Sequence, residues 1–247
     1  MSQIRPTLIA AMTCLFLGLL NTPPVRSEDP QVFEFDSYKD IVELFDQLGY
    51  TEAAWDEGLR EVNRVYLQNM PSRWRQKHSS EVEIKMKKEL FLRTLAPLVL
   101  RSNELIMEER AQLLAMLEAG QSDDPWLRAL AEKYRVAKPE DPALDRQQLD
   151  ELLHRVDLVP NSLALAQTIE ESGWGTSRFA DEGNAMFGQW AWGEDAIKPE
   201  QQRSGKGNYG IRAFDSPQDS VDGYMHNINT HRAYESLRNQ RFAVRAA

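Results

Sequence analysis

The stretch LALAQTIEESGWGTSRFADEGNAMFG, residues 163–188, decides the fold of this chain. Its first part is typical of an amphipathic helix, because Leu165 and Ile169 lie one helical turn apart and share an apolar face. Gly173 and Gly175 follow, and glycine suits the left-handed cap and the tight exit at a helix end. The stretch therefore predicts an apolar helix that ends directly before a Gly-Trp-Gly turn.

This helix is expected to begin just after Pro160. Asn161 and Ser162 follow the proline, and their side-chain oxygens are expected to accept hydrogen bonds from the free N–H groups of the first turn. With these bounds, Glu170 and Glu171 fall in the last turn.

The position of the two glutamates bears on their acidity. The C-terminal end of a helix carries a partial negative charge, which destabilises a carboxylate. If one glutamate also faces an apolar wall such as Trp174, loss of hydration raises its pKa in the same direction. A raised pKa is what a general acid needs at neutral pH. Periodicity does not say which glutamate has this role, and two solvated helix-end charges are the alternative.

Residues 167–177, QTIEESGWGTS, and residues 184–188, NAMFG, resemble the core of the family 73 glycoside hydrolases. These are bacterial N-acetylglucosaminidases that cut peptidoglycan and have an α-helical, lysozyme-like fold. The resemblance implies that Glu171, directly before Ser-Gly-Trp-Gly, is the catalytic acid, and that peptidoglycan glycan strands are the substrate. In the same motifs we predict substrate contacts from Trp174, Asn184 and Phe187.

The pattern changes after residue 188. In residues 189–193, every second residue is aromatic. Residues 208–214 are expected to form another short extended run, and a polar loop with glycines lies between the two segments. This pattern predicts a small β-hairpin lobe beside the helices. Sugar rings can lie on flat aromatic faces, so we predict substrate binding by Trp190, Trp192 and Tyr209. The alternative is that one or two of these rings pin the hairpin to the core.

A glycosidase normally needs a second carboxylate, or a group of the substrate, beside its acid. The resemblance implies an acidic residue in the β lobe, where Glu194, Asp195 and Glu200 are the candidates and Glu200 is favoured. Either Glu200 activates a water molecule or the acetamido group of the substrate attacks. All three acids also fit ordinary loop charges.

The first 27 residues are expected to be a secretory signal peptide. Arg5 precedes an uncharged stretch whose apolar part, residues 8–20, is short and interrupted for a membrane span. The protein is therefore expected to be exported to the periplasm, with an uncleaved inner-membrane anchor as the alternative. Cys14, the only cysteine of the sequence, lies in this segment. A mature chain would then have no metal–thiolate site, and no metal or cofactor is expected.

The charge balance limits the partners. The 247 residues carry 29 Lys and Arg against 38 Asp and Glu, a net charge of -9. This excess of acids argues against nucleic acid as the main partner.

Residues 28–138 are predicted to form a helical N-terminal region. An apolar i, i+3, i+4, i+7 spacing begins at Ile41 and ends at Gly49. A second element is expected from about residue 81 to residue 117, where Pro97 should kink or divide it. Residues 91–98 and 103–106, together with Arg110, resemble the N-terminal helical region of bacterial Bax-like proteins, in which it precedes a family 73-type domain. The region is expected to pack against the catalytic domain or a protein partner, and such a partner is unknown.

Residues 136–143 are polar and contain prolines, which favours a domain boundary there. Residues 139–247 would then be the glucosaminidase-like catalytic domain. Family 73 members usually continue into a Tyr-Ser-Thr or Tyr-Ala-Thr segment and a final helix, so this domain is expected to lack its C-terminal end. The run RWRQKH at residues 73–78 is predicted to be an exposed, solvated basic loop, with contact to an acidic polymer as the alternative.

Together these features predict hydrolysis of the β-1,4 bond between N-acetylglucosamine and N-acetylmuramic acid. Two other functions stay open. A lytic transglycosylase or muramidase would use the same single glutamate. A non-catalytic cell-wall binding or scaffold protein would bind peptidoglycan without turnover.

Overall fold

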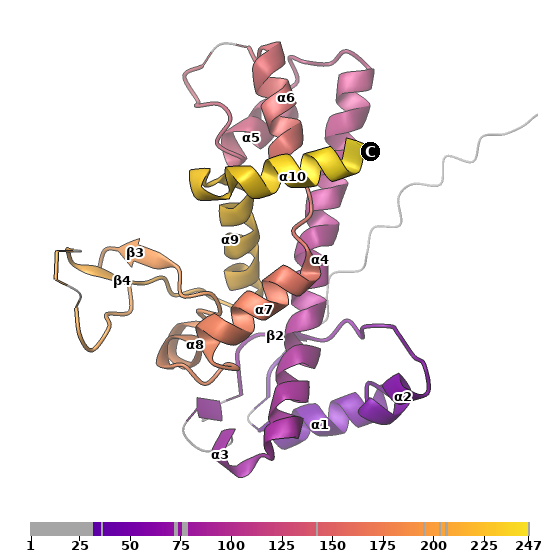
Figure 1. The fold of residues 1–247 in the computed structure, drawn as a ribbon, viewed down its shortest axis with the longest axis vertical. Helices are drawn as coiled ribbons and strands as arrows, with labels where there is room; N and C mark the ends of the chain where they lie inside the picture. Colours follow the sequence, from indigo (N-terminus) through magenta and orange to yellow (C-terminus); the bar gives the residue numbers. More distant parts are fainter. Residues whose placement is uncertain are drawn as a thin grey trace, which may run out of the picture. The chain divides into compact units, whose positions relative to one another are not determined.

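The computed structural model describes residues 32–246, apart from 36, 72–73, 76–78, 142, 195, 203 and 206. The predicted signal peptide and Asp195 lie outside the described residues. The mainly α fold is confirmed, and none of the described helices is long and apolar enough to cross a membrane (Figure 1). The helices are α1 Tyr38–Gln47, α2 Glu52–Asp56, α3 Ser79–Glu81, α4 Ile84–Glu118, α5 Pro125–Lys133, α6 Arg146–Arg155, α7 Asn161–Ser172, α8 Arg178–Gly183, α9 Pro217–Thr230, the 3-10 helix η2 Arg232–Tyr234 and α10 Glu235–Ala246.

Two small sheets accompany the helices. The predicted hairpin is confirmed, because β3 (Trp190–Trp192) pairs antiparallel with β4 (Tyr209–Ile211). In the N-terminal region, β1 (Val32–Phe33) pairs in parallel with β2 (Tyr66–Leu67). The expectation that this region is built of helices alone is therefore wrong. The paired segments are short and far apart in sequence, so no local pattern marks them.

The long helix α4 runs without interruption through Pro97. Of the two predicted effects of this proline, division of the helix is wrong, and a kink stays a prediction. Pro97 is buried, and Leu95 and Leu98 beside it are fully buried, so packing on both sides of the proline holds the helix together despite the lost backbone hydrogen bond.

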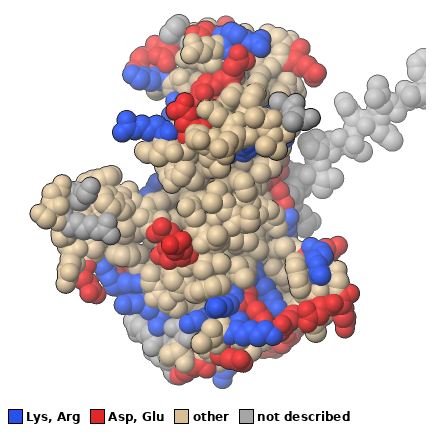
Figure 2. Space-filling view, in the orientation of Figure 1, with Lys and Arg blue, Asp and Glu red and all other residues tan. Residues whose placement is uncertain are grey.

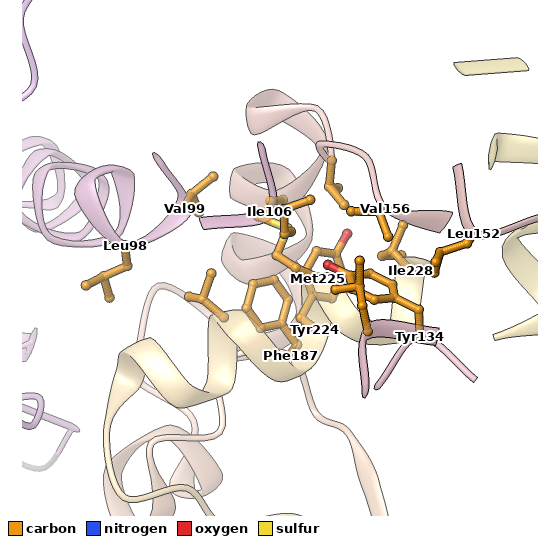
Figure 3. Packing of buried hydrophobic residues seen from close by; sticks show 14 of the residues in the cluster. Leu98, Val99, Ile106, Tyr134, Leu152, Val156, Phe187, Tyr224, Met225 and Ile228 are labelled. Atoms are coloured by element: carbon orange, nitrogen blue, oxygen red, sulfur yellow. The ribbon is translucent and has the colours of Figure 1, made fainter. Parts of the chain in front are cut away.

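The main core joins the N-terminal and C-terminal halves of the described chain. Helix α4 packs against α7 and α9, and residues 31–247 form one compact unit. The domain boundary near residue 139 stays a prediction. Figure 3 shows side chains of this core, which come from α4, α6, α9, the ends of α5 and α6, and the segment before β3; they include Leu98, Val99, Ile106, Tyr134, Leu152, Val156, Phe187, Tyr224, Met225 and Ile228.

Side chains cap the starts of α5 and α9, whereas the start of α7 departs from its predicted cap. Asp124 caps α5, and Ser216 caps α9, each by accepting a backbone N–H of the first turn. At α7 the N-cap residue is Pro160, and no side chain caps the helix. Asn161 instead accepts a hydrogen bond from the amide of Asn103 on α4 at 2.7 Å. The oxygen expected to cap α7 therefore ties it to α4.

Candidate active site

Helix α7 ends where the sequence predicts. Gly173 is its C-cap in the left-handed region, at φ +58°. Glu170 and Glu171 lie in the last turn and both are exposed. Figure 2 shows acidic side chains where α7 ends, within a surface that otherwise carries few charges. Neither side chain is therefore buried against an apolar wall.

The Gly-Trp-Gly turn faces α4. Trp174 has a φ of +61° and packs edge-on against Phe91, with ring centroids 5.8 Å apart. Lys88 lies over the same indole, its Nζ 5.2 Å from the ring centroid. A methyl group on Gly175 would lie 3.2 Å from the ring of Phe91, so this turn needs its glycine. Trp74 is buried and donates its indole N–H to the Trp174 carbonyl, which corrects the prediction of an exposed run at that residue.

Buried hydroxyls fix the exit from α7. Ser172 donates to the carbonyl of Thr168 at 2.6 Å and accepts from the N–H of Gly175 at 2.9 Å. Thr168 in turn donates to the carbonyl of Met186 at 3.3 Å. These bonds join the end of α7 both to the turn that follows it and to the NAMFG segment.

Glu171 lies against the Phe-Gly turn. Gly188 has a φ of +56°, and a methyl group at its Cα would lie 3.2 Å from Oε2 of Glu171. Glycine at this position therefore leaves the space that the carboxylate occupies. The carboxylate lies beside the turn that leads into β3 and the aromatic hairpin.

A stacked pair supports the same turn. Phe187 is buried, and its ring stacks on Tyr224 of α9 at 4.0 Å and 8°. Burial raises the pKa of the Tyr224 hydroxyl, which stays protonated and donates to Oε1 of Gln167. Gln167 lies one helical turn before Glu171. Sequence reasoning missed Gln167 and Tyr224, although the i, i+4 spacing of Gln167 to Glu171 was a usable signal.

Asn184 holds loops together. It is the C-cap of α8 at φ +50° and is buried. Its amide donates to the Asn69 side chain at 3.0 Å and to the Phe214 carbonyl at 3.2 Å. These contacts give Asn184 and the stacked Phe187 structural roles, and substrate contact by either residue stays a prediction.

The hairpin aromatics divide into one support and two exposed rings. Tyr209 is buried, and Trp190 stacks on it at 4.6 Å and 20°. Trp190 is 41% exposed and Trp192 is 66% exposed. Tyr209 therefore has the position expected of a ring that attaches the hairpin to the core, whereas Trp190 and Trp192 offer accessible ring surface.

The predicted second carboxylate lies on the loop between β3 and β4. Glu194 and Glu200 are exposed there, and Asp195 is outside the described residues. Within the described part of the chain, no hydrogen bond joins Glu200 to Glu171. The pairing of these two acids stays a prediction. Among the same residues, no group of three or more His, Cys, Asp or Glu side chains is arranged to hold a metal ion.

Comparison with known proteins identifies a family match in the C-terminal part of the chain. The glucosaminidase family model, described as mannosyl-glycoprotein endo-β-N-acetylglucosaminidase, matches residues 146–247. The chain carries a glucosaminidase-type domain. The matched residues of this domain include α7, the hairpin and α9, and hence Glu171 and the residues around it. The family resemblance predicted from the sequence is confirmed.

A curated relative extends the similarity beyond the glucosaminidase-type domain. Protein bax of Escherichia coli (strain K12) is 33% identical over 165 residues, which are 65% of this chain and 57% of that protein. The chain thus spans little more than half the length of this relative. No solved structure matches the chain. The glucosaminidase-type domain supports a glycoside hydrolase, whereas the name of the relative states no activity.

Proposed function

We propose that this protein hydrolyses the β-1,4 glycosidic bond of peptidoglycan as an N-acetylglucosaminidase, with Glu171 as the general acid. The observation that carries the proposal is the position of the Glu171 carboxylate, with Oε2 against Gly188 at the junction of α7 and the turn into the hairpin. Glu170, its neighbour in sequence, points from a different side of the helix because successive residues are rotated by about 100°. The match of residues 146–247 to the glucosaminidase family supports the same chemistry.

In the proposed mechanism, the protonated Glu171 gives its proton to the glycosidic oxygen as the bond to the sugar C1 breaks. The free carboxyl group is exposed, so the substrate itself must displace water from it. Trp190 and Trp192 supply accessible ring faces on which sugar rings of the strand can lie.

The positive charge that develops at C1 needs a nucleophile. In one route Glu200 removes a proton from a water molecule that attacks C1; in the other the acetamido oxygen of the substrate attacks. A carboxyl separation of about 6.5–9.5 Å in the substrate complex fits the water route, and about 5–5.5 Å fits direct attack by a carboxylate. The substrate lies outside the inner membrane, so the proposal includes export to the periplasm.

The first experiment measures soluble muropeptides released from purified peptidoglycan by the wild type, Glu171→Gln and Glu170→Gln. Glu171→Gln should lower release by about 10²–10⁴-fold, because general acid catalysis contributes about that factor. Glu170→Gln is the matched control and should retain most of the activity. Circular dichroism checks that all three chains are folded.

The same samples separate the other functions. Mass spectrometry should find N-acetylglucosamine at the new reducing ends. Muramic or anhydromuramic ends would show a muramidase or lytic transglycosylase instead. Binding to peptidoglycan without release by any of the three chains would show a non-catalytic wall-binding protein.

A further inference from the structure

A cavity of about 520 Å³ lies beside α9, and Glu171 is not among the residues that line it. Its walls come from α4, the end of α5, the segment after β4 and α9. On α9 it is lined by Asp222, Met225 and His226, which lie on a different side of the helix from Tyr224. We name this space the α9 cavity. It contains none of the predicted site residues.

The lining of the α9 cavity is acidic. Four carboxylates face two cations, Lys133 and Arg212. Lys133 already forms a salt bridge, because its Nζ lies 2.5 Å from Oε1 of Glu109. Burial lowers the pKa of His226, which favours its neutral form. The excess of negative charge favours a cationic ligand, and the carboxylates are Glu109, Asp215, Asp219 and Asp222.

Asp222 is the acid best prepared to hold a cation. The hydroxyl of Ser102 donates to its Oδ1 at 2.5 Å, and the amide of Gln218 donates to the same oxygen at 3.0 Å. Within the described residues both donors reach Oδ1, so Oδ2 keeps its lone pairs for a ligand. A carboxylate that is half withdrawn from water and fixed by two donors is preorganised for a charged hydrogen bond.

The remaining wall is apolar. Ile106 and Met225 are buried, and Leu105 and the ring of Phe214 complete this side of the α9 cavity. Such a surface is suited to methylene groups, which gain by leaving water. Tyr134 behind them is buried, and Nζ of Lys133 already lies 5.5 Å from its ring centroid, so this ring belongs to the wall of the cavity and not to its free surface.

We propose that the α9 cavity is a second ligand site, which takes a primary ammonium group carried on an aliphatic chain and holds it at Asp222. Two sources have this chemistry. One is an amino-acid side chain of a peptide attached to the glycan, and this source rests on the proposed function. The other is a free diamine.

The geometry supports the attached peptide. Residues 212–215 line the α9 cavity and also line a neighbouring cavity of about 440 Å³ beside the hairpin. That neighbour is bounded by Ala191 and Trp192 of β3. One short segment thus separates the exposed hairpin ring from the acidic cavity, so a sugar on the hairpin and its peptide in the α9 cavity can belong to one ligand.

Calorimetric titration of the purified protein tests the site directly. Cadaverine is the probe, and 1,5-pentanediol is its uncharged isostere. We expect cadaverine to bind and the diol to bind at least about tenfold more weakly. Asp222→Asn should lower the affinity for cadaverine by about tenfold. Asp150→Asn, an exposed acid on α6, is the matched control and should bind as the wild type does. Absent cadaverine binding, equal binding of the diol, or equal binding by Asp222→Asn would overturn the site.

A second assay separates the two sources. The wild type and Asp222→Asn are compared on peptidoglycan strands that carry peptides and on strands stripped of peptides by an amidase. An attached peptide predicts that the wild type prefers the intact strands and that Asp222→Asn loses this preference. Equal rates on both strands, with cadaverine bound, assign the site to a free diamine. No release from either strand counts against the proposed function alone, because the titration does not depend on turnover.

Discussion

Gly188 needs to lack a side chain for two separate reasons. Its φ of +56° lies in the left-handed region, where an L residue costs about 1–2 kcal/mol. In addition, a methyl group there would lie 3.2 Å from Oε2 of Glu171, which is tighter than an ordinary contact. The first reason concerns the stability of the backbone, and the second concerns the position of the proposed acid.

Gly188→Ala should therefore lower muropeptide release by more than its loss of stability explains. Gly49→Ala is the matched control, because Gly49 has a φ of +65° and no heavy atom lies within 4 Å of the added methyl group. Both variants should lose about 1–2 kcal/mol in thermal or chemical unfolding. Only Gly188→Ala should lose activity at a temperature where both are folded. Equal activity of the two variants would show that Glu171 is not held by this contact.

Asp222 gives a pH dependence of stability. Burial raises the pKa of its carboxyl above the ordinary value of 3.8. A raised pKa means that the contribution of Asp222 to stability is fully present below 3.8 and is lost as the pH rises through the raised value. Asp222→Asn should thus have a higher Tm than the wild type at pH 7, and the difference should disappear near pH 3. A difference that is the same at both pH values would contradict the assignment.

For single residues, the sequence predicts the position of a residue within its motif better than the contacts that the residue makes with other elements. The position of Glu171 in the last turn of α7 and the left-handed cap at Gly173 could be predicted because the signals are local. The contact of Glu171 with Gly188 and the bond from Tyr224 to Gln167 join different elements, so spacing does not reveal them. A motif also does not separate substrate contact from packing.

Among the elements, α10 is attached by charge and hydrogen bonds. Asp157, between α6 and α7, is 1% exposed and accepts from Arg245 at 2.5 and 2.9 Å. Arg241 lies 3.7 Å from the same carboxylate and donates to the Leu158 carbonyl at 2.7 Å. Arg238 donates to the Ile228 carbonyl at 3.0 Å. Arginines thus satisfy buried acceptors between the preceding helices and hold α10 in place.

Asp157→Asn should therefore destabilise the protein by about 3–5 kcal/mol, because it leaves buried arginine charge without its partner. Asp150→Asn removes an exposed acid paired with Arg146 and should cost less than about 1 kcal/mol. Urea unfolding measures both. Hydrogen exchange should show the largest loss of protection in α10. A cost for Asp157→Asn no greater than that of the control would mean that α10 is held mainly by its apolar contacts.

Elements with a clear apolar period could be predicted, as α1 shows. Helix α10 was missed because its attachment depends on arginines that meet backbone carbonyls, and hydrophobic periodicity does not report such contacts. The start of α7 could be predicted, but the role of Asn161 could not, because its partner Asn103 lies on another helix.

For the whole molecule, α4 is the element that both halves share. Leu98 and Ile106 belong to the same buried cluster as Val156 of the α6–α7 segment and Ile228 of α9. Local composition favours a boundary near residue 139, since the connector is polar and contains prolines. Composition reports the connector and not the contacts across it. Packing of the N-terminal helices against the catalytic domain could be expected, but the residues that form the common core could not be predicted.

Residues 139–247 made alone should therefore fail to reach a fixed native structure, because α7 and α9 would lose the apolar surface that α4 covers. Residues 31–247 should unfold in one cooperative transition, with equal calorimetric and van't Hoff enthalpies. Calorimetry and the dispersion of NMR signals compare the two chains. A cooperative transition with dispersed signals in the shorter chain would establish a folding boundary near residue 139, and the glucosaminidase-type domain would then not depend on α4.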